Sequence, residues 1–312
     1  MSDFDFTKPQ QPQPASPDGF DFTKPPAEGA APPFKPAHSQ FYNAEVAAKL
    51  FRASGKEEHF EAGQQLFAED EKASKGGLFS GKASRMYYLA KGDVALTVGA
   101  RALDTIKAGE IVGEMAVISE RPRSAAATAK TAVTAYSLNS SELQAALGKT
   151  PEFALMLMSV LFDRLRFIAA RLATRRTIGG PTTRESPTFD PVLLQQFEGA
   201  LPRSAMVRYQ AGHAIMREGQ AGVYMYVVKT GQVVIAIREK PVEVVNPGGT
   251  FGEMALVDQS PRVASATTNV YSELLAIDRA ALLEAIKAQP AFATAMLRAV
   301  VERLRHMNAQ LG

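Results

Sequence analysis

The sequence has no cysteine, no tryptophan and only four histidines among its 312 residues. Without cysteine the chain can form no disulfide, no thiolate nucleophile and no zinc site of the cysteine type. The histidines are scattered, and no pair has the H-x-x-x-H or H-E-x-x-H spacing of a metal site; they are His38, His59, His213 and His306. We therefore expect no bound metal.

Long apolar runs are lacking as well. No stretch approaches the roughly 18 apolar residues of a membrane-spanning helix, and the N-terminus lacks the basic segment and apolar run of a signal peptide. The formal net charge of +3 is too small to indicate nucleic-acid binding. We expect a cytoplasmic protein with neither a membrane nor a DNA partner.

The first 40 residues are rich in Pro, Gln, Ala and Ser and lack apolar periodicity. Such a composition cannot bury enough surface to offset chain entropy, so residues 1–40 are predicted to be a disordered, proline-rich tail. One hexapeptide occurs there twice, as Phe4–Pro9 and Phe20–Pro25. The duplication indicates either tethered docking motifs for an effector protein or low-complexity sequence without function.

A larger repeat organises the rest of the chain. Moved forward by 139 positions, residues 86–94 match 225–233 and residues 109–116 match 248–255. Upstream the offset is 149, so the first copy has about ten extra residues, which we place in an enlarged surface loop around residues 72–84. With 46% hydrophobic residues, the chain has enough apolar material for two cores.

Both copies show the same order of expected elements. Short strands come first, at 85–89, 94–98, 102–107, 224–228, 233–238 and 242–245. Helices follow, opening at Ser140, Pro151, Asp278 and Pro290. The pattern predicts an α+β, mainly β fold with two tandem antiparallel β-rolls of jelly-roll type, each followed by C-terminal helices. The expected domains are residues 41–176 and 191–312, with a linker over 177–190.

The helix beginning at Pro151 has an apolar stripe at three- and four-residue steps, made up of Phe153, Met156, Leu157, Val160, Leu161, Leu165 and Ile168. Such a stripe is typical of a core or of a contact between two copies of a chain. A homo-oligomer through the long C-terminal helices is therefore one expectation.

The residues suited to ligand chemistry form one short cluster in each copy. The clusters are Gly113-Glu114-Met115-Ala116 with Pro122-Arg123-Ser124-Ala125, and Gly252-Glu253-Met254-Ala255 with Pro261-Arg262-Val263-Ala264. The glycine allows the backbone to approach a ligand, and the helical turn after it points N–H groups at an anion. The glutamate can accept from a sugar hydroxyl, and the arginine offers a positive fork for a phosphate oxygen.

These clusters resemble the phosphate-binding cassette of the cyclic-nucleotide-binding domain family, which includes catabolite activator proteins, protein kinase A regulatory subunits and cyclic-nucleotide-gated channels. The resemblance covers about residues 50–175 and 190–312, and the same motif occurs twice at the same internal spacing. It implies that the glutamates contact the ribose and the arginines the phosphate. The implied binding residues are Gly113, Glu114, Ala116, Arg123 and Ser124, and Gly252, Glu253, Ala255, Arg262 and Val263.

Two differences between the copies bear on ligand binding. Ser124 offers a hydroxyl beside the first arginine, whereas Val263 at the same place in the second copy does not. Val112 stands where the second copy has the aromatic Phe251. A cassette that no longer binds is therefore the alternative interpretation for each copy, and it would make the chain a scaffold with one or both pockets degenerate.

The resemblance implies a sensor in which cAMP, or else cGMP, binds the roll and moves the long helix to regulate a partner protein. Catabolite activators follow the long helix with a helix-turn-helix, and no such segment follows the last helix here, so we expect no DNA binding. Kinase regulatory subunits have an inhibitory Arg-Arg segment, but no arginine precedes Phe41. The cassettes lack a paired carboxylate, nucleophile or metal, so we do not expect an enzyme.

Overall fold

The computed structural model describes residues 42–71, 84–175, 182–183 and 187–309. The expected tail of residues 1–40, its repeated hexapeptide and most of the inserted loop lie outside these ranges, as do Gly179 to Pro181 of the expected linker.

The described chain contains the same series of elements twice. The first series is α1 (Ala44–Ser54), β1 (Lys56–Phe60), β2 (Gln65–Phe67), β3 (Met86–Lys91), β4 (Val94–Val98), β5 (Arg101–Ile106), β6 (Ile111–Val112), α2 (Glu114–Ser119), β7 (Ala126–Ala129), β8 (Val133–Leu138), α3 (Ser140–Lys149) and α4 (Glu152–Arg175). After β9 (Thr182–Thr183), the second series is α5 (Pro191–Ala200), a 3-10 turn (Arg203–Ala205), β10 (Met206–Tyr209), β11 (Ala214–Met216), β12 (Met225–Thr230), β13 (Val233–Ile237), β14 (Lys240–Val245), β15 (Thr250–Phe251), α6 (Glu253–Asp258), β16 (Ser265–Thr268), β17 (Ser272–Ile277), α7 (Arg279–Ala288) and α8 (Ala291–Ala309).

Each copy folds into a roll of two antiparallel sheets. The strand orders are β1-β8-β3-β6 with β2-β7-β4-β5, and β10-β17-β12-β15 with β11-β16-β13-β14-β9. The register also repeats, because Leu89 pairs with Ala135 and Val228 pairs with Leu274 just before the same bulge in β3 and β12. The predicted fold class is confirmed, with one addition: β9 joins β14 in a parallel pairing.

Alternation along the central strand explains how each roll joins its helices. In β3, Tyr87 and Leu89 face the apolar interior of the roll, whereas Met86 and Tyr88 belong to the cluster that contains the helices. Successive strand side chains point to opposite faces, so one apolar strand serves two cores. The strand β12 divides its side chains in the same way.

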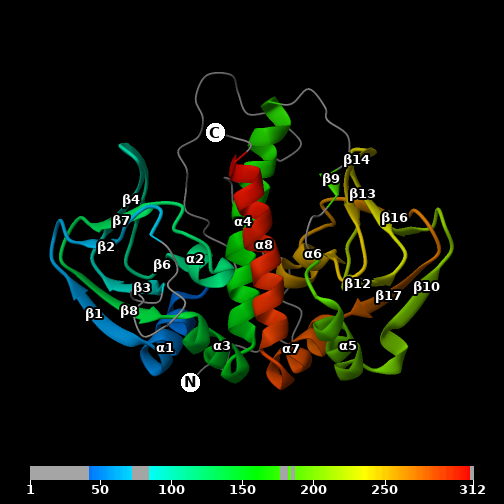
Figure 1. Ribbon diagram of the computed structural model, residues 1–312, viewed down its shortest axis with the longest axis horizontal. Coiled ribbons are helices and arrows are strands. Elements are labelled where there is room, and N and C mark those ends of the chain that lie inside the picture. Colours follow the sequence, from blue (N-terminus) through cyan, green and yellow to red (C-terminus); the bar gives the residue numbers. More distant parts are fainter. Residues whose placement is uncertain (1–41, 72–83, 176–181, 184–186, 310–312) are drawn as a thin grey trace.

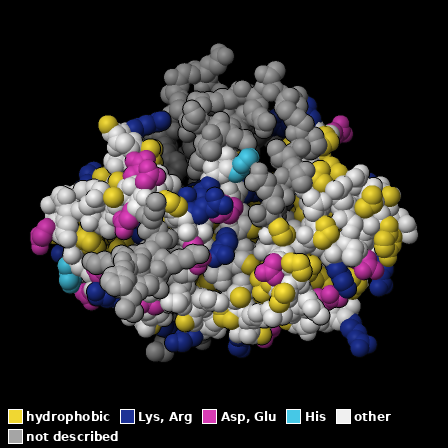
Figure 2. All heavy atoms as spheres, in the orientation of Figure 1, with side chains coloured by type: hydrophobic (Ala, Val, Ile, Leu, Met, Phe, Trp, Pro, Cys, Tyr) yellow, Lys and Arg dark blue, Asp and Glu magenta, His cyan; other side chains and the backbone are white. Residues whose placement is uncertain are grey.

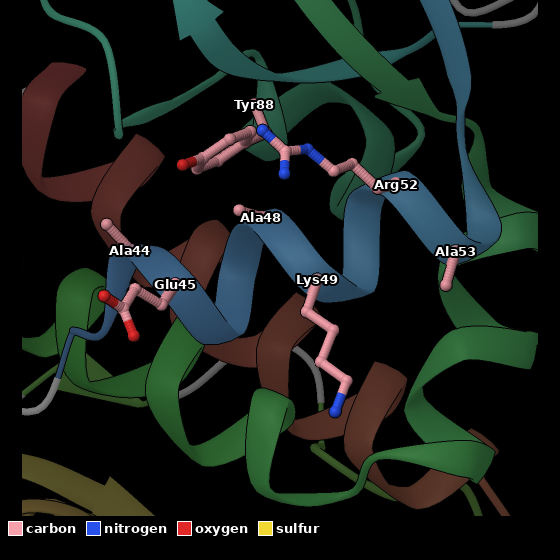
Figure 3. A pocket seen from close by; sticks show the side chains of 7 residues that line it. All are labelled: Ala44, Glu45, Ala48, Lys49, Arg52, Ala53 and Tyr88. Carbon is pink, nitrogen blue, oxygen red and sulfur yellow. The ribbon is translucent and has the colours of Figure 1, made fainter. Parts of the chain in front are cut away.

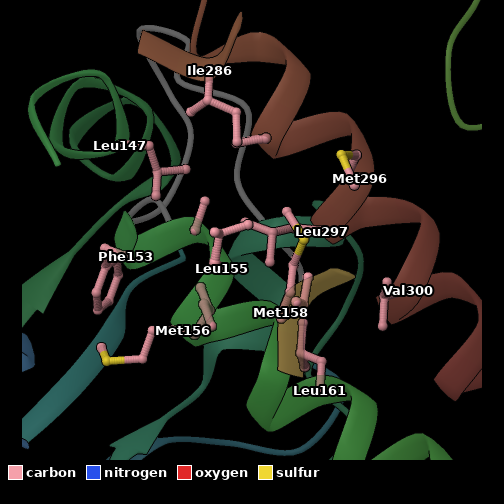
Figure 4. Close-up of a cluster of buried hydrophobic side chains, with 14 of the residues drawn as sticks. Leu147, Phe153, Leu155, Met156, Met158, Leu161, Ile286, Met296, Leu297 and Val300 are labelled. Carbon is pink, nitrogen blue, oxygen red and sulfur yellow. The ribbon is translucent and has the colours of Figure 1, made fainter. Parts of the chain in front are cut away.

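The long helices α4 and α8 lie side by side in the middle of the molecule, with one roll on each side (Figure 1). Their apolar side chains interlock in one cluster that includes residues from both copies, among them Phe153, Leu161 and Leu297 (Figure 4). The described part of the expected stripe on α4 is therefore largely buried within the chain. A homo-oligomer stays a prediction and would have to use other faces.

Within the described ranges, no single helix is long and apolar enough to span a membrane. The pair Ser140–Lys149 and Glu152–Arg166 has that length and composition together but is bent by 119° at its break.

Candidate functional site

A glycine in the left-handed conformation opens each cassette helix. Gly113 lies between β6 and α2 with φ of 82°, and Gly252 lies between β15 and α6 with φ of 77°. A side chain in this conformation is strained. A Cβ atom on Gly113 would also lie 2.8 Å from Nη1 of Arg123, and one on Gly252 would lie 2.6 Å from Nη1 of Arg262. The glycines thus allow both the sharp turn and the close approach of the arginines.

The two arginines are buried in the same geometry. Arg123 is 3% exposed and donates from Nη1 to the carbonyl of Gly113 (2.9 Å) and from Nη2 to that of Arg85 (2.7 Å). Arg262 is 5% exposed and donates to the carbonyls of Gly252 (2.7 Å) and Tyr224 (2.5 Å).

Burial lowers the pKa of both guanidinium groups, because a low-dielectric surrounding disfavours the charged form. In the part of the chain that the structure describes, neither Arg123 nor Arg262 forms an ion pair. Each positive charge therefore has neutral carbonyls as its direct partners, an environment that favours binding of an anion.

The two glutamates are the first residues of the cassette helices, and both are buried. Their partners differ. Glu114 forms an ion pair with Arg164 of α4. The corresponding arginine of α8 is Arg303, and it pairs instead with Glu243 of β14 at 3.0 Å. Among the described residues Glu253 has no ion pair, so the two cassettes hold their carboxylates in different ways.

Phe67 supplies an aromatic surface that sequence analysis missed. The centroid of its ring lies 4.0 Å from the guanidinium carbon of Arg123, and the ring stacks on Tyr87. In the second copy Tyr226 stacks on Phe251 instead, with ring centroids 5.2 Å apart. The first copy has Val112 in β6 where the second has Phe251 in β15, and its aromatic ring comes instead from Phe67 of β2. Phe67 pairs with Ala127 in the first copy, and Met216 pairs with Ala266 in the second. Phe67 and Met216 therefore occupy equivalent positions, and only the first copy has an aromatic side chain there.

The remaining predicted residues occupy two environments. Ala116 and Ala255 are buried in the cassette helices, where small side chains permit close packing. Ser124 is exposed, and Val263 is exposed by 43%. The structure therefore brings the glycine, glutamate, alanine and arginine of each copy together and leaves the residue after the arginine at the surface.

Two hollows bear on where a ligand could bind. A hollow of about 10 Å³ lies between the copies, where Leu165 of α4 faces Glu253 and Arg303. A much larger hollow of about 630 Å³ lies along α1, and Figure 3 shows Arg52 and Tyr88 on one side of that helix and Lys49 on the other. None of the predicted binding residues lines this larger hollow. Within the described ranges there is also no group of three His, Asp or Glu residues suited to a metal.

The family model described as "Cyclic nucleotide-binding domain" matches the chain twice, at residues 57–150 and 206–289. The chain belongs to the cyclic nucleotide-binding domain family. Both matches include one complete cassette, so the family assignment and the repeated geometry concern the same residues.

The relatives include a transcriptional regulator and a protein kinase. A CRP-like cAMP-activated global transcriptional regulator of Mycobacterium tuberculosis is 33% identical over 34% of this chain and 50% of its own length. A cGMP-dependent protein kinase of Caenorhabditis briggsae is 24% identical over 78% of this chain and 32% of its own. The chain thus matches half or less of these two relatives.

A solved structure of the regulatory domain of Toxoplasma gondii PKA with cAMP is 16% identical and covers 81% of this chain and 87% of its own. Its TM-score is 0.28.

Proposed function

We propose that the chain is a cyclic-nucleotide sensor, with cAMP as the preferred ligand, that regulates a partner protein. The observation that carries this proposal is the occurrence of two buried arginines, Arg123 and Arg262, each of which donates hydrogen bonds to two backbone carbonyls beside a glycine turn and forms no ion pair with a described residue. The choice of cAMP over cGMP rests on the 33% identity with the cAMP-activated regulator.

In this proposal, phosphate oxygens accept from Arg123 or Arg262 and from N–H groups at the start of the cassette helix. The ribose hydroxyl donates to Glu114 or Glu253. Gly113 and Gly252 give the phosphate room, and the buried alanines, Ala116 and Ala255, keep the helix close to the turn. Ser124 adds a hydroxyl at the rim of the first site, where the second has Val263.

The proposal assigns no catalysis to the chain and no DNA partner. It places the protein in the cytoplasm, where fractionation would test the assignment. An effector protein is proposed to bind through residues 1–40 with their repeated hexapeptide. Deletion of residues 1–38 should leave nucleotide affinity unchanged and abolish an effector contact, and a pull-down that recovers the same proteins without the tail would contradict this assignment.

Calorimetric titration with cAMP, cGMP and a cyclic dinucleotide tests the sensor proposal. We expect cAMP to bind with a dissociation constant in the micromolar range or tighter, roughly −8 kcal/mol. A scaffold with degenerate pockets would give no heat and no thermal stabilisation at millimolar nucleotide, and that result would overturn the sensor.

A further inference from the structure

Each cassette helix packs against the long helix of the other copy: α2 contacts α8, and α6 contacts α4 (Figure 1). At the first cassette the contacts from α8 are hydrogen bonds to backbone and partly exposed ion pairs. Arg298 donates to the carbonyl of Ile118 (3.2 Å), Arg305 donates to that of Pro122 (2.9 Å), and Glu302 pairs with Arg121. Charged side chains of both signs are visible on this part of the surface (Figure 2).

The second cassette is held differently, by an ion pair between Arg166 of α4 and Asp258, the last residue of α6. Asp258 is 5% exposed and also accepts from the hydroxyl of Ser260 (2.6 Å). The first copy has no carboxylate at the corresponding position, because Ser119 stands there and donates to its own helix at Met115. Removing the cationic partner of a buried carboxylate costs far more free energy than removing the partner of an exposed one.

The same helix also holds the first cassette. Arg164 lies two residues before Arg166 and pairs with Glu114. A short stretch of α4 therefore connects the carboxylate proposed to bind ribose in the first site with the end of the cassette helix of the second. Among the described residues, α8 makes no matching connection, because Arg303 pairs with Glu243 of its own copy and Arg305 donates to a backbone carbonyl.

We propose that Arg166 and Asp258 are positioning residues for the second nucleotide site, and that α4 couples the two sites within one chain. This inference rests on the proposed function, since it concerns the sites assigned there. Ribose bound to Glu114 competes with Arg164 for the carboxylate oxygens and weakens the ion pair that ties α4 to the first cassette. Because Arg166 lies on the same turn of helix, the constraint on Asp258 and α6 changes with it.

The positioning role is tested in an Arg123→Ala background, where the second site alone is left to bind cAMP. Arg166→Met should weaken that binding by tenfold or more, because it leaves Asp258 buried without its cation. Adding Asp258→Ser, which copies the residue of the first cassette, should restore most of the affinity. Arg298→Met is the matched control on the other long helix and should change affinity at the second site by less than twofold.

A purely structural pair would lower the melting temperature in Arg166→Met and leave the dissociation constant of the second site unchanged. That outcome would contradict the positioning role. Coupling is tested by measuring the cAMP affinity of the second site twice, once in the chain with an intact first site and once in the Arg123→Ala variant. We expect at least a fivefold difference in affinity that disappears in Arg166→Met/Asp258→Ser; a difference that persists there would exclude α4 as the route.

Hydrogen exchange of the α6 amides tests the coupling in the absence of nucleotide. Glu114→Gln releases Arg164 and should speed exchange of the α6 amides, Glu253–Asp258, several-fold in the otherwise unmodified chain. The effect should vanish in the Arg166→Met/Asp258→Ser variant. If Glu114→Gln leaves α6 exchange unchanged, the coupling is wrong even where both sites bind. If titration shows no nucleotide binding, the proposed function fails, whereas the exchange result still decides the link through α4.

Discussion

Arg123 and Arg262 are buried cations whose direct partners are neutral carbonyls, and this residue-scale feature dominates the chemistry of both cassettes. Arg262→Ala should therefore weaken cAMP binding at the second site more than Glu253→Ala does. An interaction with a full charge is worth about 2–5 kcal/mol when one partner is removed, whereas a hydrogen bond to a charged group contributes about 1.5–3 kcal/mol. Titration of both variants in the Arg123→Ala background checks the order, and unchanged binding in Arg262→Ala would contradict the phosphate assignment.

Gly222 gives a second test at a single residue. A Cβ atom there would lie 2.1 Å from Nε of Arg262, so Gly222→Ala must displace the guanidinium. We expect weaker cAMP binding at the second site and unchanged binding at the first. Gly199→Ala is the control, because no atom lies within 4 Å of its Cβ position in α5 and the change should stabilise the fold by about 0.5–1 kcal/mol. Equal cAMP affinities for Gly222→Ala and the unmodified chain would show that the segment between β11 and β12, which contains Gly222, does not set the position of Arg262.

At the scale of elements, β2 and β11 make the two rolls chemically different. Phe67 of β2 lies under Arg123, and Met216 of β11 occupies the corresponding place. Phe67→Leu should cost about 1 kcal/mol of stability through the lost cation–π contact and weaken the first site in an Arg262→Ala background. The paired control, Met216→Leu, should leave the first site unchanged. Weakening of the first site by Met216→Leu to the same degree would argue against this local role of Phe67.

Strands and helices could be predicted from the sequence where the turn residues and the apolar periodicity indicate the same bounds. All three expected strands of each copy lie within one or two residues of β3, β4 and β5, or of β12, β13 and β14, because glycines and charged residues delimit them. The helix at Ser140 was expected, and it begins there behind a complete capping box at Asn139.

The helices α1 and α5 were missed, although Asn43 and Asp190 cap them as the usual signals require. Both precede their rolls, where the repeat comparison gave no match to align. The cassette glycine, glutamate and arginine could be predicted because they are close in sequence. Phe67 could not, because its approach to Arg123 depends on the pairing of β2 with β7. The pairing of Arg166 with Asp258 likewise requires the two copies to be packed together.

At the scale of the whole molecule, one apolar cluster runs through both copies between α4 and α8 (Figure 4). The chain should therefore unfold thermally in one transition, despite its two repeated rolls. Leu297→Ala, at a fully buried position, should lower the free energy of unfolding by about 2–5 kcal/mol and preserve the single transition. Calorimetry checks this prediction, and two separated transitions in the unmodified chain would show that the rolls are thermodynamically independent.

The central claim is that two buried cassettes each bind a cyclic nucleotide, and a crystal structure of the full chain with cAMP tests it most directly. The account predicts two nucleotides, with phosphate oxygens within hydrogen-bond distance of Arg123 and Arg262 and ribose hydroxyls on Glu114 and Glu253. A nucleotide bound elsewhere, such as in the hollow along α1, with both arginines still on their backbone carbonyls, would contradict it.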